Sequence, residues 1–224
     1  MLFWLIYATP LTNEEIEMRK ILTLLSAAAL LATPAISQAR GFDSDFSQAI
    51  TGPLKLEIIV SEDLAHRANN LPEKLTDRSA RSRLNAAFAS NGYYGDKEIV
   101  YLLEEMEEEL REDFAKRGIA LSDTAPTVLR VTIEKVRNNR PTIKQLSVDS
   151  SLSFSSFSIG GAEITADLTS ASGEILGKAE YEYYSSFNDR PTQFARIWGD
   201  TRLAFSKFSR KLSKKLAKQG ASTS

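Results

Sequence analysis

His66 is the side chain in this sequence best suited to moving a proton near neutral pH. It is the single histidine of the 224-residue chain, and an unperturbed imidazole titrates at about pH 6.5. General acid–base catalysis also needs a partner within hydrogen-bond reach and usually a third group that orients the base. The sequence contains no G-x-S-x-G motif that would supply a serine nucleophile. We therefore expect His66 to be a surface or partly buried helix residue, and we assign no catalytic residue.

Ligands for a metal ion or a phosphate group are equally sparse. One histidine cannot build a histidine-rich centre, and the chain has no cysteine to supply thiolates. The nearest approach to a calcium loop, Asp43-Ser44-Asp45, lacks the downstream glycine and glutamate. Gly160-Gly161 follows a serine-rich run, but neither Lys-Ser nor Lys-Thr comes after it. We interpret the two glycines as a tight bend entering a strand, and we predict no metal and no cofactor.

A run of cations with helical spacing lies near the C-terminus. Six side chains form it: Lys207, Arg210, Lys211, Lys214, Lys215 and Lys218. They are either solvated charges that complement the C-terminal end of a helix dipole or an interaction surface for an anionic lipid or glycan. The same segment carries a broad apolar stripe that includes Phe208 and Leu212. That stripe favours a core helix packed on a sheet, with the interaction surface as the alternative.

The composition is that of a folded domain. The chain is 42% hydrophobic and 25% charged, and its 28 basic and 29 acidic residues give a net charge of -1. This balance argues against a nucleic-acid partner, because proteins that bind nucleic acids usually carry a basic excess. Seven carboxylates crowd the stretch 104–113, mostly on the expected solvent side of a helix. Without cysteine there are no disulfides and no lipid-attached cysteine, so a hydrophobic core alone must hold the domain together.

Residues 18–39 have the order of parts of a bacterial signal peptide. A basic start at Met18-Arg19-Lys20 precedes a mostly apolar run, and Ser37-Gln38-Ala39 is a small-x-small cleavage signal. The apolar run is shorter than the roughly 18–20 residues that a membrane span needs. We expect cleavage between Ala39 and Arg40, localisation in the periplasm or outside the cell, and no transmembrane helix in the mature chain. Residues 1–17 fit no part of a signal peptide, so we take Met18 as the expected start.

Apolar alternation and helical periodicity predict the elements that must position any site. The predicted strands cover 54–60, 129–133, 164–168 and 179–183, with a hairpin turn at 170–173 and a β-bulge near Ser155-Ser156. The predicted helices cover 62–70, 76–88, 96–116 and 192–218. In the helix over 96–116 the expected apolar stripe is Ile99, Leu103, Met106, Leu110 and Phe114.

This order of elements predicts the α+β class. We expect one antiparallel-rich sheet with helices packed on one face and a long C-terminal helix. The single domain is expected over residues 53–220, preceded by a flexible leader at 40–52 and followed by a tail at 221–224.

Several short motifs resemble an uncharacterised family of secreted proteobacterial proteins. They are Asn139-Arg140-Pro141-Thr142, the run from Ser155 to Ala162, Tyr181-Glu182-Tyr183-Tyr184 and Trp198-Gly199-Asp200. The likeness covers most of residues 54–218, and its motifs are structural in character. The plan is also similar, at the level of the fold, to envelope domains of the TolB N-terminal and outer-membrane lipoprotein-activator type. That second resemblance implies binding of partner proteins and brings no catalytic residues.

Three functions are consistent with the sequence. The first is a periplasmic, non-enzymatic binding or adaptor protein of the cell envelope, whose partner is an envelope protein or a glycan. The second is a periplasmic hydrolase whose carboxylate and serine site has no recognisable motif. The third is an envelope-surface protein that uses the basic C-terminal helix.

Overall fold

The computed structural model describes residues 41–46, 49–71, 87–186 and 195–221. All of these residues belong to one compact unit. The expected signal peptide, with its cleavage residues Ala39 and Arg40, lies outside the described residues, and so do most of the helix predicted over 76–88 and the tail from 222.

A five-stranded sheet forms one layer of the fold. Its strands are β1 (Gly41–Phe46), β2 (Leu54–Val60), β3 (Thr127–Arg137), β4 (Gly161–Thr169) and β5 (Ile175–Tyr184). They lie in the order β1-β5-β4-β3-β2. The pairs β1–β5, β5–β4 and β4–β3 are antiparallel, whereas β2 and β3 are parallel. The predicted α+β class is confirmed, with a sheet that is mixed because helices join β2 to β3 as a crossover.

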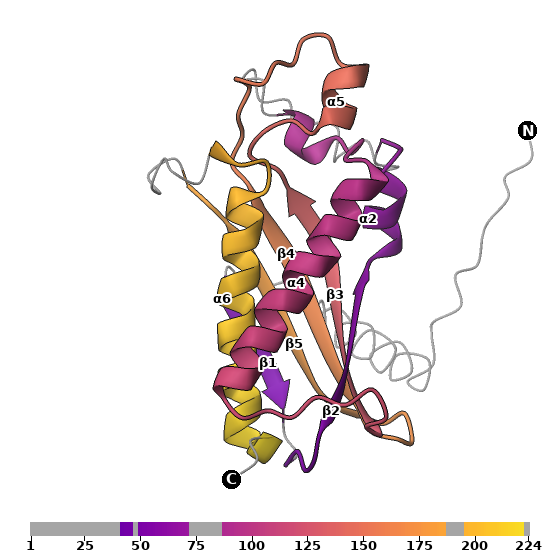
Figure 1. Cartoon of the computed structure of the whole chain (residues 1–224), viewed down its shortest axis with the longest axis vertical. Coiled ribbons are helices and arrows are strands. Elements are labelled where there is room, and N and C mark those ends of the chain that lie inside the picture. Colours follow the sequence, from indigo (N-terminus) through magenta and orange to yellow (C-terminus); the bar gives the residue numbers. More distant parts are fainter. Residues whose placement is uncertain (1–40, 47–48, 72–86, 187–194, 222–224) are drawn as a thin grey trace, which may run out of the picture. The chain divides into compact units, whose positions relative to one another are not determined.

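Two long helices form the second layer, on one face of the sheet. In Figure 1, α4 (Asp96–Lys116, magenta) and α6 (Gly199–Leu216, yellow) both lie in front of the strands. The α4 helix has the predicted bounds, and four of its five predicted apolar residues are buried. The fifth, Leu103, is only partly buried, and its neighbour Leu102 occupies the core instead. The sheet face opposite the helices carries charged side chains in ion pairs such as Lys135–Glu163.

A helix cap and the predicted hairpin turn are found in the structure. Ser61 caps α2 (Glu62–Arg67), and its hydroxyl accepts a hydrogen bond from the backbone N–H of Leu64 at 3.2 Å. Gly173, with a φ of 83°, closes the β4–β5 hairpin at the predicted turn. The helix predicted over 76–88 is described only from Ala87, where a short 3-10 helix runs to Ser90.

The prediction of a flexible leader over 40–52 is wrong for residues 41–46, which form the edge strand β1. The strand pairs with β5 and places Asp43 and Asp45 opposite Glu180 and Lys178. Its apolar residues face the helices, and Phe46 is only 4% exposed. The alternation of apolar and polar residues in β1 is short. Its glycine, serine and two aspartates are residues typical of loops, so the segment was predicted as a loop.

The prediction of a bulged strand near Ser155-Ser156 is also wrong. After the short helix α5 (Ile143–Val148), the chain runs as an irregular loop until β4 begins at Gly161. The loop is held by main-chain contacts, since Ser158 N–H donates to the carbonyl of Asn139 at 2.9 Å. The apolar residues of this loop switch from even to odd positions. They can do so because the loop is not a strand, in which alternate residues must face the same side of a sheet. A register shift does occur elsewhere in the sheet, in β3 between Ile133 and Lys135.

The C-terminal helix begins seven residues later than predicted because a buried polar pair fixes its first turn. The predicted start is 192, and α6 starts at Gly199. Asn139 Nδ2 donates to Asp200 Oδ2 at 2.5 Å, and Asp200 N–H donates back to Asn139 Oδ1 at 2.8 Å. Gly160 N–H donates to the same Asp200 oxygen at 3.0 Å. Three of the motifs behind the family resemblance thus meet in one buried hydrogen-bond cluster that joins β3, β4 and α6.

Candidate functional site

His66 lies on the exposed side of α2, as the sequence predicts. Among the residues that the structure describes, no group of three or more histidine, cysteine or carboxylate side chains could hold a metal ion. In the same part of the chain no helix is long and apolar enough to cross a membrane. Gly160-Gly161 forms the bend at the entry to β4, where a Cβ on Gly160 would lie 2.7 Å from Asn139 Oδ1. The bend therefore allows the close approach that the buried hydrogen-bond cluster requires.

The cationic helix is a core helix, which was the favoured interpretation. Its apolar stripe packs on the sheet, and Phe205, Phe208, Leu212 and Leu216 are each 0% exposed. The cations lie beside this stripe, and most of them are exposed. Lys207, Lys211, Lys214 and Lys218 follow steps of four, three and four residues, so they share one flank of the helix, and Arg210 lies at the edge of the same flank.

A hollow opens where this flank meets strand β5. It has a volume of ≈ 380 Å³, and we call it the α6–β5 groove. Its lining is Gly41, Tyr181, Glu182, Tyr183, Tyr184, Lys207, Arg210 and Lys211. Three of the six predicted surface cations therefore converge on a cluster of tyrosines. Lys214, Lys215 and Lys218 continue along the chain outside the groove.

Aromatic rings hold the lysines of the groove in place. Lys207 Nζ lies 3.8 Å from the ring centre of Tyr183, and Lys211 Nζ lies 5.1 Å from that of Tyr181. Within the described residues, no ion pair involves Lys207, Arg210 or Lys211. Burial raises the pKa of Tyr181 to about 12, so its hydroxyl stays neutral at physiological pH. The groove thus presents three cations and one carboxylate, Glu182, beside a cluster of aromatic rings, so positive charge is in excess.

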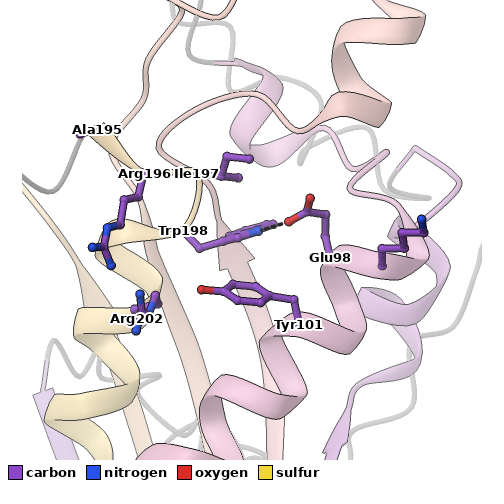
Figure 2. Close-up of a pocket in the computed structure, with 8 residues that line it drawn as sticks. Glu98, Tyr101, Ala195, Arg196, Ile197, Trp198 and Arg202 are labelled. Carbon is purple, nitrogen blue, oxygen red and sulfur yellow. Dashed lines mark hydrogen bonds between the residues drawn. The ribbon is translucent and has the colours of Figure 1, made fainter.

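A second pocket, shown in Figure 2, lies between the N-terminal parts of α4 and α6 and has a volume of ≈ 580 Å³. The Trp198 indole N–H donates to Glu98 Oε2 at 2.5 Å. Arg202, one turn after Trp198, forms an ion pair with Glu105, which lies two turns after Glu98 on α4. Tyr101 lies between these two contacts, and its ring faces the pocket (Figure 2). We call this the helix-pair pocket.

The helix-pair pocket was not predicted from the sequence. The signal was present, because Glu98, Tyr101 and Glu105 fall on one face of a helix at steps of three and four residues. Trp198 and Arg202 show the same spacing. What the sequence could not provide is the pairing of the two helices, since residues 100 positions apart come together only in the folded chain.

The fold and the two pockets define an α+β domain with cationic and aromatic recesses on either side of α6. No protein-family model matches the chain, and no curated protein matches it. Among solved structures, it is similar to a PelC variant dodecamer from Paraburkholderia phytofirmans, with 10% sequence identity and a TM-score of 0.37. The match covers 82% of this chain and 98% of that one.

Proposed function

We propose that the protein is a secreted, non-enzymatic binding protein of the cell envelope that holds an acidic glycan in the α6–β5 groove. The observation that carries the proposal is the convergence of Lys207, Arg210 and Lys211 on the rings of Tyr181 and Tyr183. Cations attract the carboxylates of uronic acids, and aromatic rings provide a flat surface for the apolar face of a sugar. A binding role of this kind requires no general base and no nucleophile.

The spacing of the cations favours an extended ligand. Lys207 to Lys218 spans about 16 Å at 1.5 Å per helical residue. Lys211 and Lys214 lie between them on the same flank. A polymer with a carboxylate on successive sugars can contact several of these cations at once. A single small anion would use only the groove itself.

The packing of α6 argues for a glycan rather than a lipid surface. A helix that binds in the membrane interface inserts its apolar face among the acyl chains. The apolar face of α6 is already used, because Phe205, Phe208 and Leu212 are fully buried against the sheet. The helix therefore offers charge to a ligand but no free apolar stripe to a bilayer.

Export supports the envelope as the place of action. Residues 18–39 have the basic, apolar and cleavage regions of a signal peptide. The groove would then be exposed to the glycans of the periplasm or the cell surface.

Affinity electrophoresis in native gels tests the glycan. The wild-type protein should be retarded in a gel that contains alginate, a polyuronate, and should migrate freely in one that contains neutral dextran. The double variant Lys207→Gln/Lys211→Gln should lose the retardation, each variant being compared with its own dextran lane. Lys178→Gln is the matched control, because Lys178 lies on β5 but on the sheet face away from α6, 3.6 Å from Asp167.

Three results would contradict the proposal. The double variant could be retarded by alginate as strongly as the wild type. Double-stranded DNA could compete with alginate at equal charge concentration, which would indicate a general polyanion surface. The wild type could float with phosphatidylglycerol vesicles while ignoring alginate, which would make an anionic lipid the ligand.

A further inference from the structure

The helix-pair pocket is built from side chains that the packing already fixes. Trp198 is 3% exposed, and its ring meets that of Tyr94 edge to face with centres 5.5 Å apart. Its indole N–H is committed to Glu98. Side chains held in this way lose little conformational entropy when a ligand binds, so the pocket is preorganised.

Cations outnumber carboxylates at the pocket, because Lys97, Arg196 and Arg202 line it together with Glu98. Figure 2 places the Arg196 and Arg202 guanidinium groups on one side and the Glu98 carboxylate on the other, with the rings of Tyr101 and Trp198 between them. Arg202 is neutralised by its ion pair with Glu105, whose side chain is only 14% exposed. Arg196 is exposed, and within the described residues no carboxylate forms an ion pair with it.

We propose that the helix-pair pocket binds a small organic anion that carries a flat ring. The ring lies against Tyr101 and the edge of Trp198, and the carboxylate or sulfonate of the ligand pairs with Arg196. A planar guanidinium can donate two parallel hydrogen bonds to such a group. A volume of ≈ 580 Å³ is ample for a ligand of this size.

This site is independent of the proposed glycan groove. Lys207 and Lys211 line the α6–β5 groove, whereas Arg202 faces α4 from the other side of the same helix. The two sites share no lining residue. Either site can therefore be removed without altering the other.

Trp198 offers a direct reporter of binding. The chain has two tryptophans, Trp4 and Trp198. In the full chain that carries Trp4→Phe, the fluorescence on excitation at tryptophan wavelengths comes from Trp198 alone. Three probes separate the contributions of ring and charge: phenylacetate has both, acetate has the charge without the ring, and phenethylamine has the ring with the opposite charge.

Phenylacetate should change the Trp198 emission saturably, with a dissociation constant of about 1 mM or tighter. Acetate and phenethylamine should leave the emission unchanged over the same range. Isothermal titration should give the same constant. Arg196→Gln should weaken binding about tenfold or more, because a charge-assisted hydrogen bond is lost. Arg210→Gln, an exposed arginine of the α6–β5 groove, should bind phenylacetate like the parent protein.

Equal affinity of Arg196→Gln and the parent protein would overturn the assignment, and so would the absence of saturable binding. Equal binding of phenethylamine would overturn the preference for an anion, and equal binding of acetate would overturn the role of the ring. Lys207→Gln/Lys211→Gln should bind phenylacetate normally, so a failure of the glycan proposal can be recognised separately. An unchanged thermal melting curve for Arg196→Gln verifies that the variant is folded.

Discussion

Asp200 shows how one buried residue fixes the start of an element. Its carboxylate accepts from Asn139 and from the backbone of Gly160, and the residue is 1% exposed. Truncation leaves two buried donors without a partner, and each such donor costs about 1–3 kcal/mol. We predict that Asp200→Ala lowers the free energy of unfolding by at least about 2 kcal/mol, measured by urea denaturation.

Asp167→Ala is the control for that measurement. Asp167 lies on the open face of the sheet, 3.6 Å from Lys178, with a side chain that is 44% exposed. Exposed ion pairs contribute little, so its loss should cost less than about 1 kcal/mol. Similar losses of unfolding free energy for both variants would mean that the buried hydrogen-bond cluster does not anchor α6.

For His66, another single residue, we predict that substitution has little effect on stability or function. Its side chain is exposed on α2. We expect His66→Ala to change the free energy of unfolding by less than about 1 kcal/mol, as for most exposed sites. The variant should also complement a deletion strain as well as the wild type does. A variant that accumulates normally but fails to complement would point to a histidine-dependent activity and against a pure binding role.

At the scale of elements, α4 and α6 stabilise the fold by packing on the sheet. Leu110 and Phe208 are both 0% exposed. Leu110→Ala and Phe208→Ala should each cost about 2–5 kcal/mol, the range for buried large-to-small substitutions. Val100→Ala is the control on α4, because Val100 is 53% exposed. A thermal melt that shows either core variant unchanged would contradict the packing of that helix.

The elements with strong periodicity were predictable from the sequence, whereas those fixed by tertiary contacts were not. The α4 helix was predicted with its observed bounds because Ile99, Met106, Leu110 and Phe114 repeat along one face. The edge strand β1 was missed because only its pairing with β5 distinguishes it from a loop. The only sequence signal for the short helix α5 is the capping box between Thr142 and Gln145.

The candidate sites also combine residues that the sequence indicates with contacts that only the folded chain provides. Lys207, Arg210 and Lys211 stand out in the sequence as a charged helical flank. The tyrosines that turn this flank into a groove come from β5, more than twenty residues earlier in the chain, and no sequence spacing links the two. A single sequence therefore identified the cations but not the recess that they line.

At the scale of the whole molecule, we predict export with cleavage after Ala39. The motivation is the sequence of basic, apolar and small-x-small regions between Met18 and Ala39. N-terminal sequencing of the protein from a periplasmic fraction should read Arg40 first. Intact Met1 or Met18 on protein from a soluble cytoplasmic fraction would show that the chain is not exported.

The measurement that tests the central claim most directly is the affinity of the α6–β5 groove for a uronic-acid oligomer at two salt concentrations. Isothermal titration of the wild type with an alginate oligomer should give saturable binding that weakens from 50 to 200 mM salt, because salt screens exposed charges. Lys207→Gln/Lys211→Gln should bind at least about tenfold more weakly and respond less to salt, since two charge-assisted contacts are lost. Lys178→Gln should match the wild type. If the double variant binds with wild-type affinity and the same salt response, the groove is not the glycan site and the proposed function is wrong.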